Sequence, residues 1–324
     1  MSIPATGRSV VNDFYVLPDW LRQEVPDKAA LEQLYFFRAQ GLNTVCQQAK
    51  CPNWTSCFKE NQASFLILGD TCTRNCSFCN VKKGRALEAS LKDEPLLVRD
   101  AVKALRLEYV VVTSVTRDDL DDGGASCFAE TVKEIRGISE NIKIEILIPD
   151  FAGSRAALKT VLDAGAHVIG HNLETVPRLY PLLRPKASYS RSLGILDNIK
   201  MFNSGIITKS ALLLGMGERE EEVVGVVRAL VLAGCDILTL GQYLAPSPQH
   251  YPVAEFITPQ RFDYYRDLAL SFGIKHVLSG PKVRSSYKAQ EVYNSVKLKV
   301  WGHPHRLAAK TVPPFGKKDA PKYA

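Results

Sequence analysis

The chain has 324 residues, of which 46% are hydrophobic and 23% are charged, and its formal net charge is +7. This length supports one large domain or two ordinary ones, and the composition is ordinary for a soluble globular protein. The moderate positive charge permits an acidic partner without requiring one. Since a basic solvated surface explains it, we expect no nucleic-acid partner.

The N-terminal sequence MSIPATGRSVVNDF lacks the basic start and apolar core of a signal peptide. No apolar run reaches membrane-spanning length, so we expect no membrane partner and a cytoplasmic location. Thiols stay reduced in that compartment. Six of the eight cysteines lie between residues 46 and 79, and under reducing conditions this density favours metal ligation over disulfides.

Residues 1–62 form a predicted N-terminal extension, because they precede any regular alternation of elements. Within it, KAALEQLYFFRAQGL has apolar residues at helical spacing and ends at Gly41. This pattern predicts a helix that lies on the body of the protein. The apolar side chains expected to pack there are Trp20, Leu31, Leu34, Tyr35 and Phe36. Three of the clustered cysteines follow this helix.

Short apolar segments alternate with helix-like stretches between residues 63 and 244. The predicted strands lie at 63–70, 107–115, 142–150, 166–174, 206–218 and 235–244. The predicted helices lie at 94–106, 125–140, 153–164, 188–204 and 219–233. Alternating βα units with mainly apolar strands imply an α/β fold with a parallel sheet covered by helices. Six such units form either a doubly wound sheet or an incomplete barrel.

Residues 245–300 form a predicted closing segment, with a helix at 259–272 and a strand near 274–279. The tail at 301–324 has five Lys or Arg residues against one Asp, and we expect a mobile extension there. Polar residues and glycines cluster after the strands, in TSVTRDDLDDGG, HNLET, LGMGE and GQYLAPS. Because the carboxyl ends of parallel strands carry the active site in α/β proteins, these segments predict its position.

Cys72, Cys76 and Cys79 form a C-x3-C-x2-C motif on a tight loop directly after the first predicted strand. Three thiolates on a [4Fe–4S] cluster leave one iron open for chemistry. A structural zinc site normally uses paired C-x2-C arms and four ligands, and a bacterial ferredoxin motif uses two-residue gaps throughout. The spacing fits neither, and with Phe78 before the last cysteine it resembles the radical S-adenosylmethionine (SAM) superfamily signature.

This resemblance implies a partial (β/α)6 TIM-type barrel with N- and C-terminal extensions, which agrees with the six predicted units. It also implies that the open iron is chelated by the amino and carboxylate groups of SAM. An electron from the cluster then cleaves SAM and yields a 5′-deoxyadenosyl radical. In such enzymes the cofactors carry the chemistry, and the protein supplies binding and orientation.

Cys46, Cys51 and Cys57 have the spacing C-x4-C-x5-C, so a second cluster bound there would also lack one thiolate ligand. Near the C-terminus, GPKVRSSY occupies residues 280–287, and by itself it is typical of a polar loop after a strand. Together, the two triplets and this segment resemble lipoyl synthase. In that family the second serine of the motif, here Ser286, is the fourth ligand of the auxiliary cluster.

The resemblance covers roughly residues 13–295 and includes TSVTRDDLDDGGA, HNLETVPRLYPLLRP, YSRSL, LTLGQYLAPSPQHYPV and SGPKVRSSYKA in the expected order. It implies two [4Fe–4S] clusters, SAM, and insertion of two sulfur atoms at C6 and C8 of a protein-bound octanoyl-lysine chain. The auxiliary cluster would be the sulfur donor and would be consumed. An oxygen ligand among soft thiolates would be its labile one.

The implied partners are an octanoylated carrier domain, a reductant and a source of new clusters. The carrier is a dehydrogenase E2 lipoyl domain or the glycine-cleavage H protein. The electron donor is of the ferredoxin or flavodoxin type, and an iron–sulfur carrier rebuilds the spent cluster. The sequence does not select among these proteins.

Further polar residues at strand ends are candidates for SAM contacts. We predict that Thr113 and Ser114 bond the methionyl part of SAM, that Asn172 and Glu174 hold its amino or ribose groups, and that Arg191 pairs with its carboxylate. The alternative is that each residue caps a helix or closes a loop.

Other reactive residue types have simpler explanations. The acidic segment from Asp118 to Asp122 permits an acid–base or metal-binding interpretation, and a solvated turn before Gly123 explains it equally well. We predict that Cys127 and Cys235 are small buried apolar residues, and that His171 is a packed residue rather than a base. Arg284 is a candidate for positioning the auxiliary cluster or the substrate loop.

Two alternatives to lipoyl synthase remain at this point. One is another two-cluster radical SAM sulfur-inserting enzyme, methylthiotransferase-like or biotin synthase-like. The other is a two-cluster electron-transfer protein, for which a complete βα barrel with an open iron would be surplus. The Arg-Ser-Ser-Tyr segment discriminates against the first alternative, because methylthiotransferases bring their extra cysteines in a distinct N-terminal domain.

Overall fold

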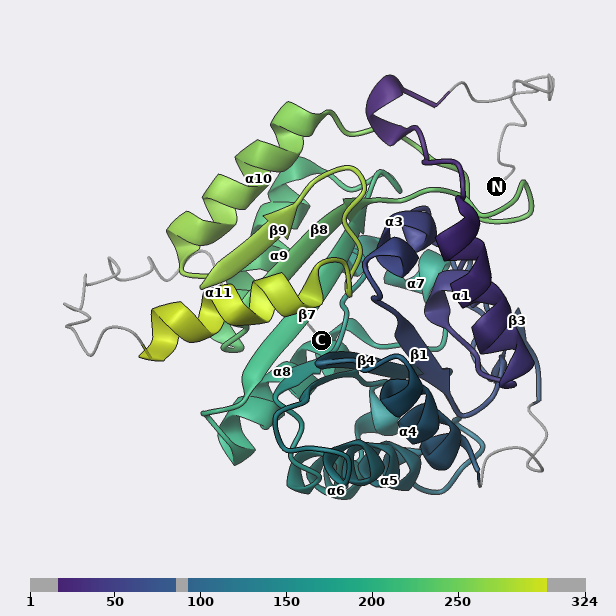
Figure 1. The fold of residues 1–324 in the computed structure, drawn as a ribbon. Helices are drawn as coiled ribbons and strands as arrows, with labels where there is room; N and C mark the ends of the chain where they lie inside the picture. The colour runs from purple at the N-terminus through teal and green to yellow at the C-terminus, as the bar shows by residue number, and fades with distance from the viewer. Residues whose placement is uncertain (1–16, 86–92, 302–324) are drawn as a thin grey trace.

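The structure, a computed structural model, describes residues 17–85 and 93–301, with side chains described as far as residue 297 (Figure 1). Its seven-stranded sheet has the order β1-β4-β5-β6-β7-β8-β9, and all its neighbouring strands are parallel. These strands are β1 (Ser64–Ile67), β4 (Tyr109–Ser114), β5 (Lys143–Leu147), β6 (Val168–Gly170), β7 (Ile207–Leu214), β8 (Ile237–Gln242) and β9 (His276–Ser279). A separate pair joins β2 (Thr71–Cys72) to β3 (Lys82–Lys83).

Helices connect and cover the strands. The α-helices are α1 (Lys28–Ala39), α2 (Val45–Gln48), α3 (Trp54–Lys59), α4 (Glu94–Ala104), α5 (Ala125–Arg136), α6 (Arg155–Asp163), α7 (Tyr180–Leu183), α8 (Tyr189–Phe202), α9 (Glu220–Leu232), α10 (Pro259–Phe272) and α11 (Ala289–Trp301). The described residues also form the short 3₁₀ helices η1 (Asp19–Leu21), η3 (Phe151–Gly153) and η4 (Pro177–Leu179).

The sheet adds its strands in sequence order, which distinguishes the two folds that the sequence left open. A doubly wound sheet reverses its strand order at a switch point, and this sheet does not. Among the described residues no pairing joins β1 to β9, so the sheet is a partial barrel with two edges. The predicted partial barrel is confirmed, with β9 as a seventh strand in the same sheet.

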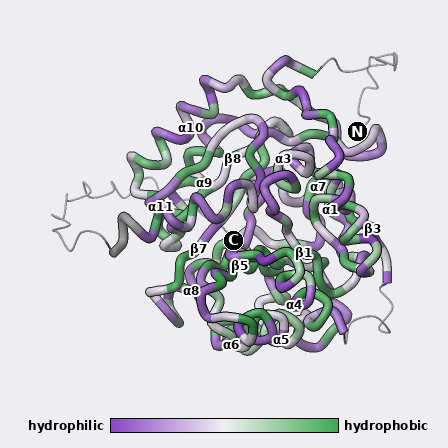
Figure 2. Tube along the Cα trace, in the orientation of Figure 1, coloured by the Kyte–Doolittle hydropathy of each residue, from purple (hydrophilic) through white to green (hydrophobic). Residues whose placement is uncertain are grey.

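The ends of α10 illustrate why the predicted helix boundaries hold. Thr258 precedes this helix, and its hydroxyl accepts a hydrogen bond from the Arg261 amide. Pro259 occupies the first position, where its missing N–H is harmless. Gly273 ends the helix with φ of 114°, a conformation that favours glycine. In Figure 2 the tube of α10 alternates between hydrophobic and hydrophilic residues, as expected for a helix with one covered face.

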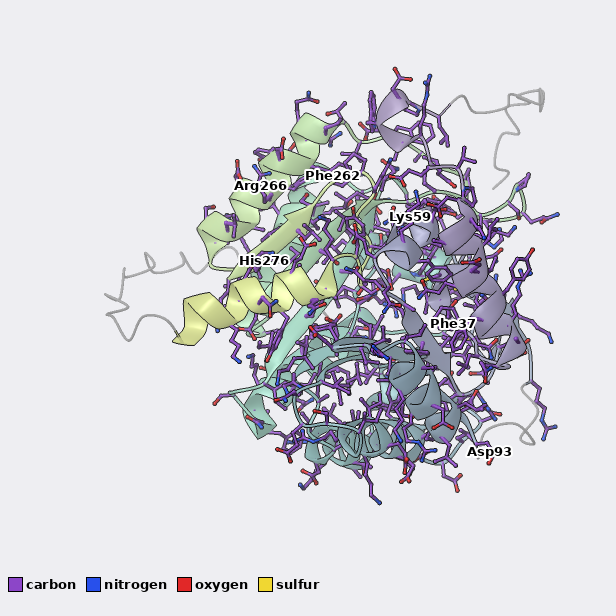
Figure 3. All side chains as sticks on the ribbon, in the orientation of Figure 1. Phe37, Lys59, Asp93, Phe262, Arg266 and His276 are labelled. Carbon is purple, nitrogen blue, oxygen red and sulfur yellow. The ribbon has the colours of Figure 1, made fainter. Side chains whose placement is uncertain are left out.

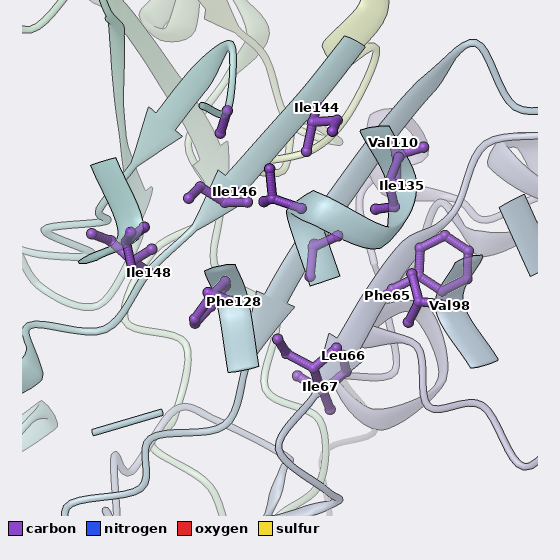
Figure 4. Close-up of a cluster of buried hydrophobic side chains, with 14 of the residues drawn as sticks. Phe65, Leu66, Ile67, Val98, Val110, Phe128, Ile135, Ile144, Ile146 and Ile148 are labelled. Carbon is purple, nitrogen blue, oxygen red and sulfur yellow. The ribbon is translucent and has the colours of Figure 1, made fainter. Parts of the chain in front are cut away.

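The core lies between the strands and the helices that cover them. Figure 4 shows part of it, in which Phe65 of β1, Val98 of α4, Val110 of β4 and Phe128 of α5 belong to one buried cluster. A second cluster joins β7 and β8 to α9 and α10. Each fully buried aliphatic or aromatic side chain contributes about 1.5–3 kcal/mol to stability. The strands are thus a rigid base for the loops at their ends.

The N-terminal extension packs beside β1, the first edge strand (Figure 1). Phe37 of α1, labelled in Figure 3, is fully buried and contacts the rings of Phe58 in α3 and Phe65 in β1. The predicted helix is confirmed, and its predicted contact face is confirmed in part. Leu34 and Phe36 pack against the core, whereas Tyr35 is 62% exposed and Leu31 is 37% exposed. Because a helix has 3.6 residues per turn, its apolar residues cannot all face the same neighbour. In α1 the fully buried residue on the contact face is Phe37.

One predicted strand is interrupted. β6 ends at Gly170, and the chain pairs with β7 again only at Glu174, which has a left-handed φ of 66°. The segment between them, which includes Asn172, therefore leaves the regular ladder. Such irregular backbone at a strand end commonly re-aims side chains next to an active site.

α11 closes the end of the barrel at which the strands begin. Tyr293 contacts the rings of Tyr109 and His167, which lie at the starts of β4 and β6. Val292 and Val296 pack on Ile237, the first residue of β8. The polar and glycine-rich loops that follow the strands therefore lie at the opposite end of the barrel, where the strands end.

Two sequence predictions are not tested here. The domain boundaries at residues 62, 244 and 300 stay predictions, and residues 302–324 of the predicted mobile tail lie outside the described part of the chain. None of the helices in residues 17–85 and 93–301 has the length and apolar character needed to cross a membrane.

Candidate active site

Cys46, Cys51 and Cys57 line one cavity of about 200 Å³, together with Ser286. Cys46 lies in α2, Cys57 lies in α3, and Cys51 lies in the turn between these helices. Ser286 comes from the loop that follows β9. The fold therefore brings the predicted fourth ligand to the same cavity as the three thiols, across more than two hundred residues of sequence.

Burial raises the pKa of the Cys46 and Cys51 thiols, and it raises the pKa of Cys57 to about 12. The nearby Arg284 guanidinium opposes this effect at Cys51. Without a metal these thiols stay protonated, and a bound cluster would supply the positive charge that deprotonates them. Three thiols and one hydroxyl around one cavity fit an iron–sulfur cluster by the chemistry of the donor set.

The loop that carries Ser286 is fixed to the sheet and to the first cysteine triplet. The Gln242 amide of β8 donates a hydrogen bond of 3.2 Å to the Pro281 carbonyl. Asn53, a buried side chain between Cys51 and Cys57, donates one of 2.5 Å to the Lys282 carbonyl. The position of Ser286 relative to the thiols is therefore held from two sides.

Cys72, Cys76 and Cys79 follow β1 on a loop that neighbouring elements hold in place. The Ser77 amide donates to the Leu183 carbonyl of α7 at 3.0 Å, and the Cys79 amide donates to the Cys76 carbonyl at 3.2 Å. The Arg74 amide contacts the Cys72 sulfur at 3.4 Å. A backbone N–H that points at a ligating sulfur is a common means of stabilising a cluster thiolate.

Arg74, inside the second triplet, anchors the loop to the barrel. Its guanidinium bonds Asp118 through two contacts of 2.8 Å and bonds Asp150 at 2.5 Å. The predicted solvated turn is therefore only part of the explanation for the acidic segment, because Asp118 holds the cluster loop. Asp122 accepts bonds from Gly124 and Ser126 at the start of α5, as a helix cap does.

Burial raises the pKa of Cys76, with an opposing contribution from Arg184, and raises the pKa of Cys79 to about 12. Arg184 also donates hydrogen bonds of 3.1 Å to the carbonyls of Asn172 and Leu173. Each cysteine triplet thus has one arginine that acts on one of its thiols: Arg184 on Cys76, and Arg284 on Cys51.

Both arginines also act on the carboxyl group of Glu174. Burial raises its pKa, and Arg184, a hydrogen bond from Asn172 and Arg284 each lower it. The Asn172 amide donates that bond to Glu174 Oε1 over 3.0 Å. The net effect is a raised pKa, because burial outweighs the opposing contributions of the two arginines and Asn172. Glu174 therefore shares its environment with the two arginines that act on Cys76 and Cys51.

The remaining predicted SAM contacts lie at or near the ends of the strands. The Thr113 hydroxyl donates to the Leu147 carbonyl at 2.8 Å, whereas the Ser114 hydroxyl is buried and has no partner among the described residues. Arg191, in the first turn of α8, lies 3.5 Å from Asp150. Phe78 packs against the second core cluster. These assignments stay predictions, and the unpaired Ser114 hydroxyl is the one best placed to accept a new partner.

His171 and the two lone cysteines behave as packed residues. His171 is 2% exposed, and burial lowers its pKa to about 4, so the ring is neutral. Its Nδ1 contacts the Ile148 carbonyl at 2.9 Å, while Nε2 is buried without a partner in the described residues. Cys235 is buried and Cys127 half-buried, and burial raises the pKa of each to about 12.

The sequence interpretation missed three side chains that hold the site. They are Arg74, Arg184 and Asn80. Asn80 follows Cys79, and its side-chain amide donates a hydrogen bond of 2.7 Å to the Gln48 carbonyl. This bond connects the two cysteine loops. Arg184 lies in the segment HNLETVPRLYPLLRP, but its spacing from any cysteine carries no signal. For Arg74, the one available signal was the position of a charged residue between two predicted ligands, Cys72 and Cys76.

No group of three His, Cys, Asp or Glu side chains in the described ranges is arranged to hold a single metal ion. A cubane is held at four separate corners, each by a different iron. The absence of such a group in the described ranges therefore concerns sites for a single metal ion and not sites for a cubane.

The sequence comparisons agree on one family. Residues 66–230 match the model of the radical SAM superfamily. The chain is 52% identical over 275 residues to the lipoyl synthase of Caldicellulosiruptor saccharolyticus, which covers 85% of this chain and 96% of that protein. It is 50% identical over 280 residues to the lipoyl synthase of a Geobacter species, covering 86% and 95%.

A solved structure supports the fold. Streptococcus suis SuiB bound to S-adenosylmethionine superposes with a TM-score of 0.53 at 13% identity, covering 76% of this chain and 59% of that one. At this identity the likeness concerns the fold alone. With half of the sequence shared along nearly the full length of its relatives, the chain belongs to the lipoyl synthase family of the radical SAM superfamily.

Proposed function

We propose that this enzyme inserts two sulfur atoms, at C6 and C8, into an octanoyl chain held in amide linkage on a lysine of a carrier protein. Family membership favours this reaction over the methylthiotransferase-like, biotin synthase-like and electron-transfer alternatives. The observation that supports it most directly is the position of Ser286, which lines the cavity of Cys46, Cys51 and Cys57.

The family implies a [4Fe–4S] cluster with SAM, and a second cluster. We infer that Cys72, Cys76 and Cys79 hold the first, and that Cys46, Cys51, Cys57 and Ser286 hold the second. When bound, the first cluster and SAM supply a radical that removes hydrogen from carbon, and the auxiliary cluster supplies sulfide.

The residues of this chain then have distinct tasks. Arg74, Asp118 and Asp150 hold the loop of Cys72, Cys76 and Cys79 rigid. Glu174 and Asn172 present polar atoms to SAM, and the neutral His171 is buried next to the Ile148 carbonyl. Holding reactants in fixed geometry is the main contribution that a protein can make to radical transfer, because it brings the reacting atoms together and excludes side reactions.

The substrate is proposed to be an octanoylated dehydrogenase E2 lipoyl domain or the glycine-cleavage H protein. A ferredoxin or flavodoxin would supply electrons, and an iron–sulfur carrier would rebuild the consumed cluster. We place all of these reactions in the cytoplasm.

An anaerobic assay tests the proposal. The reconstituted protein, incubated with dithionite, SAM and an octanoyl-lysine peptide, is expected to give lipoyl peptide and 5′-deoxyadenosine. It is also expected to contain about eight irons per chain. Formation of 5′-deoxyadenosine without a sulfur-bearing product would contradict the sulfur-insertion proposal, and four irons after full reconstitution would contradict the auxiliary cluster.

A further inference from the structure

The cavity of the first cysteine triplet reaches the surface at the end of the barrel where the strands begin. Its outer residues include Glu60, Asn61, Arg106 and Glu108, which are exposed. Asn61 lies shortly before β1, and Arg106 and Glu108 lie directly before β4. Because the strands are parallel, these segments share one end of the sheet. Cys46, at the inner end of the cavity, is buried.

The second cysteine triplet lies at the other end of the same strand. Cys72 follows the carboxyl end of β1, with Cys76 and Cys79 beyond it. Neither these three cysteines nor Asn172 or Glu174 line the cavity of the first triplet among the described residues. The cavity of the first triplet therefore opens at the end of the barrel opposite to the strand end that Cys72, Cys76 and Cys79 follow.

Arg284 forms part of the wall between them. It lines the cavity and acts on Cys51 on one side, and it acts on Glu174 on the other. Its Nη1 bonds the Val283 carbonyl at 2.7 Å, so the side chain is fixed against its own backbone.

The first turn of α11 borders the opening. Ala289 and Gln290 line the cavity, while the next turn of the helix covers the strand starts through Tyr293. Gln290 is half-buried and Glu108 is exposed, and no side chain among the described residues forms a hydrogen bond or ion pair with either. Both are therefore at the edge of the opening, where a larger side chain can be introduced without breaking a described contact.

We propose that this opening, defined by Glu60, Asn61, Arg106, Glu108 and Gln290, is the entry route for a preformed [4Fe–4S] cluster into the auxiliary site. The inference rests on the proposed function, in which that cluster is consumed and must be replaced. A separate entrance lets a new cluster arrive while SAM and the carrier use the opposite end of the barrel.

The transfer is a ligand exchange without net redox change. The donor holds the cubane on thiolates. For each iron that Cys46, Cys51 or Cys57 binds, one Fe–S bond to a donor thiolate breaks and one Fe–S bond to this chain forms. At the fourth iron, one Fe–S bond to a donor thiolate breaks and one Fe–O bond to Ser286 forms. Each cysteine or serine proton passes to the departing donor thiolate, which leaves as a thiol, so charge and atoms balance.

Two full-length variants narrow the opening from two different segments of its lining, Gln290→Trp in α11 and Glu108→Trp before β4. Asn294→Trp, at an exposed position one turn further along α11, is the size-matched control. Each is made in a chain with Cys72, Cys76 and Cys79 replaced by Ala, so that only the first triplet can load. Circular dichroism melting verifies that every variant is folded.

Loading is followed by the absorption of the growing cluster, with a glutathione-ligated cubane and a protein-bound cubane as separate donors. We expect at least tenfold slower loading in the two narrowed variants and an unchanged rate in Asn294→Trp. Slowing with one donor only identifies the source that uses the route. Unchanged rates with both donors in both narrowed variants would overturn the proposal.

A second readout keeps both triplets and involves no cluster. Iodoacetamide is applied to the cluster-free chain, and alkylation of each cysteine peptide is timed by mass spectrometry. Gln290→Trp is expected to slow alkylation of Cys46, Cys51 and Cys57 and to leave the rates of Cys72, Cys76 and Cys79 unchanged. Equal slowing of both triplets would contradict a separate entrance. Neither experiment measures lipoyl formation, so failure of the proposed function would be seen independently.

Discussion

Ser285 Oγ donates a hydrogen bond of 3.1 Å to Asn172 Oδ1, across 113 residues of sequence. Asn172 also donates to Glu174, in the irregular segment after β6. The loop with Ser286 is therefore tied to the predicted SAM side of the barrel through Ser285, while Ser286 itself lines the auxiliary cavity. Two adjacent serines thus lie at two different predicted sites.

The two serines are expected to differ in their effect on catalysis. Ser286→Ala removes the predicted cluster ligand, so lipoyl formation is expected to fall at least a hundredfold while 5′-deoxyadenosine formation is retained. Ser285→Ala removes one hydrogen bond, with a net cost of about 0.5–1.5 kcal/mol, and is expected to retain most of the sulfur insertion. Both products are measured by mass spectrometry under anaerobic conditions. A Ser286→Ala enzyme with full lipoyl yield would refute the ligand role.

Glu174 is predicted to bind the amino or ribose groups of SAM, next to Arg184 and Arg284. Glu174→Gln keeps the acceptor for Asn172 but cannot carry a negative charge. Since hydrogen bonds to charged groups contribute about 1.5–3 kcal/mol, and 1.4 kcal/mol is tenfold in affinity, the Kd for SAM is expected to rise about tenfold or more.

Titration calorimetry of the reconstituted protein with SAM measures this change. Glu221→Gln, at an exposed position in α9, is the matched control and is expected to leave the Kd unchanged. An unaltered Kd in Glu174→Gln would remove this residue from the SAM site.

The sequence predicted the strands, the main helices and the grouping of the cysteines, because hydrophobic periodicity and ligand spacing are local signals. The ends of α10 are a clear case, since Thr258, Pro259 and Gly273 specify them without tertiary contacts. Where neighbouring elements decide, local signals fail. Which face of α1 is buried depends on Phe58 and Phe65, so Tyr35 was wrongly expected to pack.

The same limit applies to the site. The grouping of Ser286 with the first triplet was expected from family resemblance alone, and no local pattern links residues so far apart. Arg184 acts on Cys76 only because α7 folds back on the cysteine loop, where the Leu183 carbonyl accepts from Ser77. Arg191 contacts Asp150, a pairing that follows from how α8 packs near η3.

His171 predicts a pH dependence of stability. Burial lowers its pKa to about 4, against about 6.5 in an unfolded chain. The unfolded state therefore binds more protons between these values, and stability is lost as the pH falls from about 6.5 to about 4, by about 3 kcal/mol for this residue.

Urea unfolding at pH 7 and pH 4.5 measures the loss. His171→Gln keeps an N–H donor for the Ile148 carbonyl but cannot be charged, so its loss over this interval is expected to be smaller than that of the parent protein. His250→Gln, in the loop where His250 contacts Ser247, is the control and is expected to lose as much as the parent. Equal losses in the parent and in His171→Gln would show that this ring does not titrate as its burial implies.

Gly241 permits the close approach of the Ser286 loop to β8. A Cβ at this position would lie 2.0 Å from the Val283 carbonyl oxygen and 3.3 Å from Arg284 Nη1. Gly241→Ala must therefore displace the loop, at a cost of about 1–3 kcal/mol, and the auxiliary cavity loses the part of its wall formed by Arg284 and Ser286.

We expect the iron content of Gly241→Ala after reconstitution to fall from about eight to about four per chain, because only the second triplet still holds a cluster. Gly225→Ala in α9, where nothing lies within 4 Å, is expected to retain eight irons and to gain about 0.5–1 kcal/mol in stability. Full iron content in Gly241→Ala would mean that the auxiliary cluster does not depend on how closely this loop approaches β8.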